Sequence, residues 1–277
     1  MSLSEILIDN EEKKIQTRNK ELYKKSYPTN PLKIIKELKN LNKDQKMKLL
    51  ISLIIIFLFG ILNNIEILGN PTPKNQCYYD MILEWTKFFN SYYRENDIYR
   101  ILLTISSSVL IDIVFIITAF YWIFYAIDWR YSIIVFLFYL SRGIMQQILI
   151  LGYPDLLYFK YPYFPSIVIS YVQGSDFFFS GHCGFPIIGM MEFFWVKKYY
   201  LAGYCGFVSI FEFFMMVNCI AHYTIDFIFG IIFGHYISIV GREWIDNLYE
   251  HYDFLNKLKL ENKEELKKIG YHLDIGE

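Results

Sequence analysis

The chain lacks three features that mark zinc-binding, nucleic-acid-binding and secreted proteins. Its four cysteines include no Cys-x-x-Cys pair, so neither a zinc site nor a disulfide framework is indicated. The formal net charge is only −1, which removes any global electrostatic case for binding nucleic acid. The first residues contain no short basic segment followed by an apolar one, so no cleavable signal peptide is expected.

Apolar residues are what the chain has in excess, at 54% of its 277 positions. Several runs of about 20 residues carry almost no charge, the length a helix needs to cross about 30 Å of hydrocarbon. This pattern excludes a soluble protein. We predict an all-α polytopic membrane protein built as a bundle of six transmembrane helices. The expected spans are Met47–Leu68, Ile101–Ile127, Tyr131–Leu151, Phe177–Val196, Tyr199–Ile220 and Ala221–Gly241.

The basic residues predict how this bundle is oriented. With a cytosolic N-terminus, ten Lys and Arg near span ends lie on the cytosolic side and five on the opposite side. The positive-inside rule therefore favours both termini in the cytosol. We expect a polar cytosolic tail at residues 1–46, the six-span region at 47–241 and a second cytosolic tail at 242–277.

Two short polar segments stand out against the apolar background. Ser180-Gly181-His182 lies at the outer end of the fourth span, and His222-Tyr223-Thr224-Ile225-Asp226 opens the sixth. The predicted topology puts both on the non-cytosolic face, so His182 and His222 can meet. On one helix, His222 and Asp226 at i and i+4 share a face. The carboxylate can then accept from one imidazole nitrogen and leave the other as a nucleophile or base.

These residues also have structural interpretations. A lone intramembrane histidine is usually a hydrogen-bonded core residue, but a neighbouring carboxylate and a second histidine favour function, because ionisable groups at membrane depth are costly. Ser180 and Gly181 indicate a helix N-terminus that can bind an anion, although the same residues would serve simple helix capping. His235, thirteen residues after His222, is expected to be a buried, hydrogen-bonded side chain.

Three short patterns carry a family resemblance. Residues 174–183 keep Asp176, Ser180, Gly181 and His182 at the spacing of C-G-D-x-x-x-S-G-H-T, with Cys183 in place of the Thr. Residues 222–226 match H-Y-T-x-D, and residues 139–142 match Y-x-x-R. The chain thus resembles the sphingomyelin synthase-like branch of the type 2 phosphatidic acid phosphatase superfamily, which also includes the plant phosphatidylcholine:diacylglycerol cholinephosphotransferases.

The resemblance implies a phosphotransferase acting on lipids. His222, oriented by Asp226, would form a phosphohistidine with the headgroup of a phospholipid donor, and His182 would act as general acid and base. Phosphocholine would pass from phosphatidylcholine or a related donor to ceramide or diacylglycerol. No cofactor or metal is implied. The enzyme would reside in the Golgi, endoplasmic reticulum or plasma membrane with its site on the lumenal or exoplasmic face, and a homo-oligomer is compatible with this assignment. The substrate-binding residues would be Tyr139, Arg142, Asp176, Ser180, Gly181 and Tyr223.

Two other functions stay open. A lipid phosphate phosphatase of the same superfamily would carry K-x6-R-P and S-R-x5-H-x3-D, whose basic side chains clamp a phosphate dianion. The chain has no Arg-Pro pair, and Met215-Met216 stand at the S-R positions, which favours a diester. The third alternative is a non-catalytic membrane scaffold.

The roles of several polar residues are open as well. Arg142 either orients phosphate or forms an ion pair with one of the mid-span carboxylates Asp112, Glu192 and Glu212. Asp176, with Tyr171 and Phe177, could form an aromatic and acidic cage for a quaternary ammonium group.

Overall fold

The computed structural model describes residues 41–64, 79–126, 128–149, 152, 162–169 and 177–268. These residues form α-helices and their connections, with no strand among them. The helices are α3 (Lys43–Asn64), α4 (Met81–Trp85), α5 (Lys87–Glu95), α6 (Asp97–Phe124), α7 (Arg130–Ile148), α8 (Gly181–Trp195), α9 (Tyr199–Asn218) and α10 (Thr224–Lys268). The predicted all-α class is confirmed in this part of the chain.

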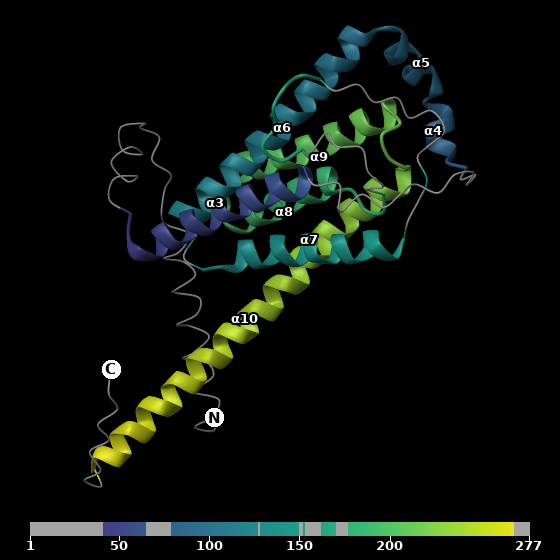
Figure 1. Ribbon diagram of the computed structural model, residues 1–277. Helices are drawn as coiled ribbons and strands as arrows, with labels where there is room; N and C mark the ends of the chain where they lie inside the picture. The colour runs from purple at the N-terminus through teal and green to yellow at the C-terminus, as the bar shows by residue number, and fades with distance from the viewer. Residues whose placement is uncertain are drawn as a thin grey trace.

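Helix α8 is the centre of the bundle and packs against α6, α7, α9 and α10 (Figure 1). Its 15 residues are largely buried, because Phe185, Ile188 and Phe193 enter a core shared with α6, α7 and α9. Helix α10 has 45 residues, about 68 Å at 1.5 Å per residue, and extends well beyond the bundle, as Figure 1 shows. It runs without a break through residue 241, where the expected boundary between the six-span region and the C-terminal tail lies.

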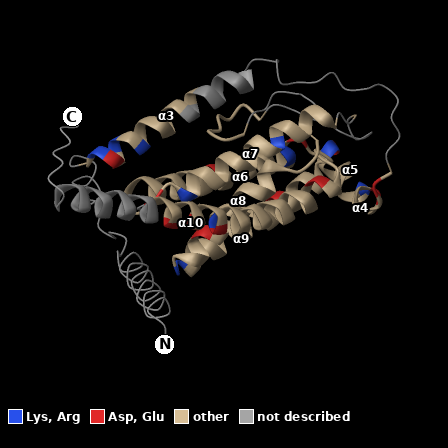
Figure 2. Cartoon of the chain, turned by 90° about the horizontal axis from the view of Figure 1, so that it is seen from below, with Lys and Arg blue, Asp and Glu red and all other residues tan. Residues whose placement is uncertain are grey.

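Three helical segments in the described chain are long and apolar enough to cross a membrane, namely Asp97–Phe124, Tyr199–Asn218 and Thr224–Tyr252. Less than half of each apolar stretch is buried inside the protein, so the rest of its surface requires an apolar surrounding such as lipid. Charged residues lie mostly toward the helix ends in Figure 2, with tan residues between them. These features indicate a membrane protein, and the count of six spans stays a prediction.

Glycines bring α8 and α10 unusually close together. A Cβ at Gly230 would lie 2.5 Å from the carbonyl oxygen of Ser180, and one at Gly234 would lie 2.7 Å from that of Gly184. Side-chain atoms are not tolerated at such distances, so only glycine permits this packing. The contact matters for function because it fixes the first turn of α8 against the first turns of α10.

A buried lysine holds α3 against the C-terminal end of α6. Lys48 has no exposed surface; it donates to the carbonyl oxygen of Ala126 at 2.8 Å and pairs with Asp44 at 3.1 Å. Its ammonium group also lies 5.9 Å from the ring centre of Trp122 and 5.7 Å from that of Trp129. A hydrogen bond, an opposite charge and two aromatic faces compensate for the lost hydration.

Candidate functional site

The connection between α9 and α10 carries the first histidine. Residues 219–223 make this turn, with Ile220 in the left-handed region at φ 49°, and α10 begins at Thr224. His222 therefore precedes α10, which corrects the expectation that it shares a helix with Asp226. The sixth span was expected to begin at Ala221 because the apolar run is continuous there. Asp226 accepts from the backbone N–H of Tyr223 at 3.3 Å. This capping interaction makes the helix begin at Thr224 rather than at Ala221.

The predicted pair of side chains is nevertheless in contact. Nδ1 of His222 lies 3.2 Å from Oδ2 of Asp226, and the carboxylate is fully buried while the imidazole is 7% exposed. With Asp226 as acceptor, Nδ1 carries the proton and Nε2 keeps its lone pair.

Asp226 also positions the loop before α8. Its Oδ1 accepts from the backbone N–H of Phe178 at 3.1 Å, and its carbonyl oxygen accepts from the N–H of Ser180 at 2.7 Å. Phe178 and Phe179 have φ values of 76° and 35°, a conformation that is costly for residues other than glycine. One acidic residue thus ties His222 to the loop that leads into His182.

The two histidines face each other across this junction. The ring centroids of His182 and His222 are 6.1 Å apart, with the ring planes at 61°. His182 is half-buried in the first turn of α8. The backbone hydrogen bonds of Asp226 and the close packing at Gly230 hold the two elements at this separation.

Arg142 and Tyr139 approach the same helix end from α7. A Cβ at Gly181 would lie 3.5 Å from Nε of Arg142 and 3.5 Å from Cε1 of Tyr139. Nε of Arg142 also donates to the carbonyl oxygen of Phe179 at 3.2 Å. Since α7 ends at Ile148, Arg142 lies within two turns of the C-terminal end of this helix. The guanidinium group is therefore at the N-terminus of α8, next to Gly181.

The carboxylates considered as ion-pair partners of Arg142 have other partners. Asp112 accepts from Ser166 Oγ at 2.9 Å and from the N–H groups of Ile167 and Val168, the latter at 3.0 Å. Separately, Glu192 accepts from Arg242 at 3.2 Å, and Glu212 from Ser107 Oγ at 2.8 Å.

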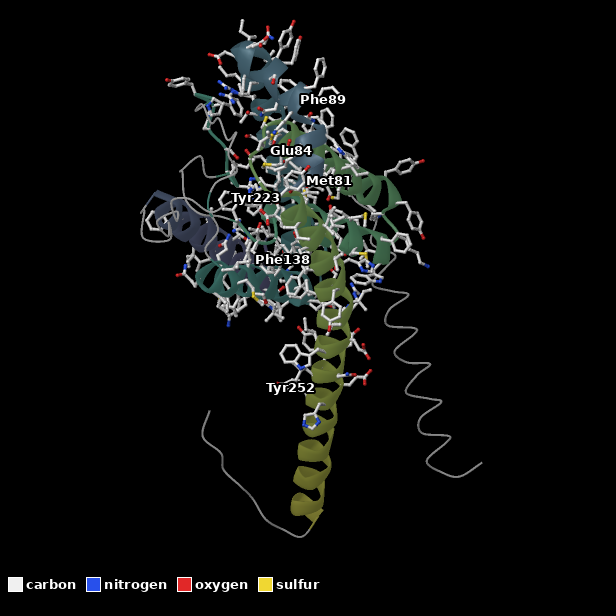
Figure 3. The ribbon with its side chains drawn as sticks, turned by 90° about the vertical axis from the view of Figure 1, so that its right-hand side faces the viewer. Met81, Glu84, Phe89, Phe138, Tyr223 and Tyr252 are labelled. Atoms are coloured by element: carbon white, nitrogen blue, oxygen red, sulfur yellow. The ribbon has the colours of Figure 1, made fainter. Side chains whose placement is uncertain are left out.

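The remaining expected site residues have different surroundings. Tyr223 is buried and donates from its hydroxyl to the carbonyl oxygen of Gly152 at 3.0 Å; Figure 3 shows it within the bundle. Phe177 is 2% exposed and packs its ring against those of His222 and Tyr223, with both centroids at 5.6 Å. Ser180 is fully buried at the start of α8. Asp176 and Tyr171 fall outside the described residues.

One expectation about a histidine is wrong. His235 is exposed on α10 rather than buried, because it lies on the outward face of the helix. Among the residues that the structure describes, no three His, Cys, Asp or Glu side chains are grouped as metal ligands would be.

Asp80 is a neighbour of the site that the sequence pattern does not indicate. Its Oδ1 caps α4 by accepting from the N–H groups of Ile82 and Leu83 at 3.1 and 3.2 Å. The same carboxylate accepts from the backbone N–H of Thr224 at 2.6 Å and from the Thr224 hydroxyl at 2.9 Å. Asp80 therefore caps two helices and fixes the first residue of α10. An Asp directly before an apolar helical run predicts the cap of α4, but nothing local predicts the second contact.

These features define a helical membrane protein with two histidines and a buried aspartate at the junction of two helix N-termini. Residues 79–242 match the sequence profile of the AtPDCT1/2 family, which comprises phosphatidylcholine:diacylglycerol cholinephosphotransferases. This segment covers more than half of the chain and contains every expected site residue, so the chain belongs to that family. No curated protein and no solved structure matches the chain.

Membership of this family indicates a lipid enzyme of the cholinephosphotransferase type. It supports the resemblance to the phosphatidylcholine:diacylglycerol cholinephosphotransferases. The sphingomyelin synthase-like assignment stays a prediction.

Proposed function

We propose that the protein transfers phosphocholine from phosphatidylcholine to diacylglycerol through a phosphohistidine on His222, at the non-cytosolic face of the membrane. The observation that carries this proposal is the arrangement of His222, Asp226 and His182, with the two imidazole centroids 6.1 Å apart. A single phosphoryl group can contact both rings at this separation. Ceramide is the second acceptor, favoured by the motif that the chain shares with the sphingomyelin synthase-like branch.

In the first step, Nε2 of His222 attacks the phosphorus of the donor. A P–N bond forms while the P–O bond to the diacylglycerol oxygen breaks, and His182 donates a proton to that oxygen. Asp226 stabilises the positive charge that develops on the His222 ring. The products are free diacylglycerol and an enzyme that carries phosphocholine.

In the second step, the hydroxyl of an incoming diacylglycerol attacks the same phosphorus. His182, now neutral, takes the hydroxyl proton as the new P–O bond forms and the P–N bond breaks. His222 returns to its starting state and His182 is again protonated, so no proton or electron is gained or lost in the full cycle.

The charges around the site favour a phosphodiester over a phosphate monoester. Arg142 and the N-terminus of α8 supply positive potential on one side. The carboxylates of Asp80 and Asp226 occupy the amide groups at the N-terminus of α10 on the other side. A diester with one negative charge suits this balance, whereas a dianion would be repelled by two carboxylates without the basic clamp of the phosphatases.

We further propose six spans with both termini in the cytosol, in the Golgi, endoplasmic reticulum or plasma membrane. The helices α3, α7 and α8 would complete the set with α6, α9 and α10. Helix α8, at 15 residues, covers only about 23 Å, and the strained loop before it extends the crossing.

Transfer of label from the acceptor tests the proposed function. Because donor and product are both phosphatidylcholine in the diacylglycerol reaction, the label must be in the acyl chains of diacylglycerol, or of ceramide in a parallel assay. Purified protein with unlabelled phosphatidylcholine should convert the label into phosphatidylcholine or sphingomyelin. His222→Ala should reduce conversion to background. His235→Ala, a matched change at an exposed histidine of α10, should keep it.

The same preparation separates the alternatives. Release of inorganic phosphate from phosphatidic acid, with no label transfer, would identify a phosphatase. Wild-type conversion by His222→Ala would refute the mechanism. Absence of turnover on every lipid, together with an unchanged cellular effect of His182→Ala, would favour a scaffold.

A further inference from the structure

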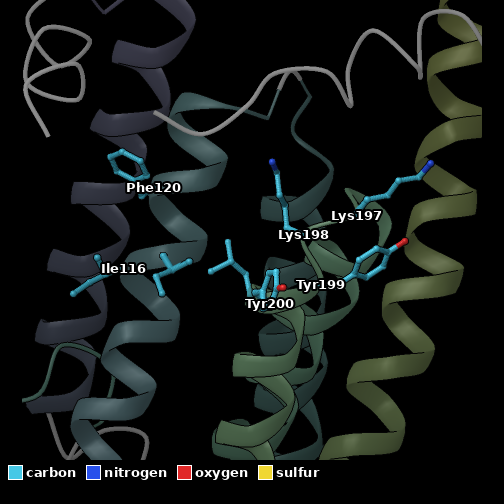
Figure 4. Close-up of a pocket in the computed structure, with 8 residues that line it drawn as sticks. Ile116, Phe120, Lys197, Lys198, Tyr199 and Tyr200 are labelled. Atoms are coloured by element: carbon cyan, nitrogen blue, oxygen red, sulfur yellow. The ribbon is translucent and has the colours of Figure 1, made fainter. Parts of the chain in front are cut away.

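A cavity lies at the end of the bundle remote from the histidines. It has a volume of about 560 Å³ and is formed by α6 and the turn between α8 and α9. Ile116, Ile117 and Phe120 of α6 form one wall. Lys197 and Lys198 of the turn border the other side (Figure 4). The cavity surface is therefore apolar, and two lysine side chains stand at its border.

The position of the cavity along α9 indicates its depth in the membrane. Helix α9 begins at Tyr199 and ends at Asn218, just before the turn that holds His222. Its 20 residues span about 30 Å, the thickness of the hydrocarbon layer. When α9 crosses the bilayer, Lys197 and Lys198 are at the headgroup level of the leaflet opposite the catalytic site.

The residues that follow the lysines fit the interfacial position. Tyr199 is 58% exposed and Tyr200 is 97% exposed, and tyrosine is enriched where a membrane meets water. In Figure 4 both lysine amino groups lie in the upper part of the view, with Lys197 extending toward α10, while Ile116 lies lower along the cavity. A lipid with its headgroup at the lysines would place an acyl chain along α6.

We propose that this cavity binds a phospholipid with a net negative headgroup, at a site distinct from the transferase site. The lysines bind the phosphate and carboxylate groups, and the α6 wall contacts the acyl chain. Phosphatidylcholine is a weaker ligand because it has no carboxylate, so its quaternary ammonium group cancels the phosphate charge and leaves no net attraction to the lysines. By the positive-inside orientation this is the cytosolic leaflet, where anionic lipids are concentrated.

Native mass spectrometry of the purified full-length protein tests the proposal, since it counts bound lipids directly and requires no turnover. The probes are phosphatidylserine and phosphatidylcholine with the same acyl chains, and glycerophosphoserine, which has the headgroup alone. We expect phosphatidylserine to bind with the highest affinity and glycerophosphoserine not to be retained. Each lysine should contribute about fivefold to the preference for phosphatidylserine, so Lys197→Gln/Lys198→Gln should lower it by about 25-fold.

A matched double variant controls for net charge. Lys43 and Lys46 are exposed lysines of α3, on the same expected face but outside the cavity, and Lys43→Gln/Lys46→Gln should keep the preference. Ile116→Trp, which fills the cavity and keeps both lysines, should lose bound phosphatidylserine. Equal losses in both double variants, or unchanged binding in Ile116→Trp, would overturn the proposal and indicate diffuse attraction instead. Label transfer by His222 is measured separately, so failure of one proposal leaves the other tested on its own.

Discussion

Asp226 is the residue on which the candidate site depends most. Its two carboxylate oxygens accept hydrogen bonds from the N–H of Phe178 and the N–H of Tyr223 and contact the imidazole of His222. A buried carboxylate that loses an oxygen acceptor leaves at least one donor unsatisfied. Position 226 therefore affects both the histidine and the loop that leads to α8.

Asp226→Asn tests the electrostatic part of this role while keeping the side-chain volume. The amide cannot compensate the charge on His222, so we expect kcat to fall by about 100-fold, within the range of acid–base effects, with a smaller change in KM. Label transfer measures both constants. Asp246→Asn is the control, because Asp246 is on the same helix, is half-exposed and pairs with Arg130 at the other end of the bundle. Equal kcat values in the two variants would contradict the assignment.

Asp80 gives a prediction about positioning. Asp80→Ala removes the caps of both α4 and α10, and loss of a helix cap costs about 1 kcal/mol. We expect a lower thermal unfolding temperature and a lower kcat, because Thr224 then no longer fixes the start of α10 beside His222. Thr224→Val removes only the hydroxyl contact and keeps the backbone bond to Asp80, so its effect should be smaller. A larger effect of Thr224→Val would rule out the backbone contact as the main one.

The sequence predicts which polar side chains lie together better than it predicts the contacts that hold them there. The four-residue spacing of His222 and Asp226 brings them together even though His222 precedes the helix. The contact of Arg142 with the Phe179 carbonyl depends on α7 docking against the loop. The contact of Asp80 with Thr224 joins residues 144 positions apart. Such contacts depend on tertiary packing, which a local pattern does not specify.

At the scale of elements, the pair α8 and α10 determines the geometry of the site. The glycine contacts at Gly230 and Gly234 set the approach of the two helices, and the histidines are at their adjoining ends. Run length alone predicted where most of these helices lie. It did not predict the start of α10, because the side chains of Asp80 and Asp226 determine that start rather than hydropathy.

Gly230→Ala tests whether this approach is required. The added methyl would lie 2.5 Å from the Ser180 carbonyl oxygen, so α8 must move, at a cost of about 1–3 kcal/mol. We expect lower thermal stability and a loss of label transfer larger than the stability change explains. Gly203→Ala is the matched control, because a Cβ there has no atom within 4 Å and alanine favours a helix. Wild-type transfer by Gly230→Ala would show that the close approach is dispensable.

At the scale of the whole molecule, the bundle has two chemically different ends. The histidines, Asp80 and Arg142 lie at one end, and the lysine turn lies at the other. Between them the helices expose large apolar side chains such as Phe136 and Phe207, as expected for a surface in contact with lipid. The two ends should therefore be on opposite sides of the membrane.

Cysteine labelling tests this arrangement with one exposed position at each end. Tyr200 is 97% exposed beside the lysine turn, and Tyr79 is 80% exposed next to Asp80. In sealed microsomes, a membrane-impermeant maleimide should label Tyr200→Cys directly and Tyr79→Cys only after permeabilisation. The unsubstituted chain gives the background of its own four cysteines. The reverse labelling pattern would mean the opposite orientation in the membrane and would place the lysine cavity in the lumenal leaflet. Labelling of both positions from one side would exclude a crossing between them, and with it the assignment of the histidines and the lysine cavity to different leaflets.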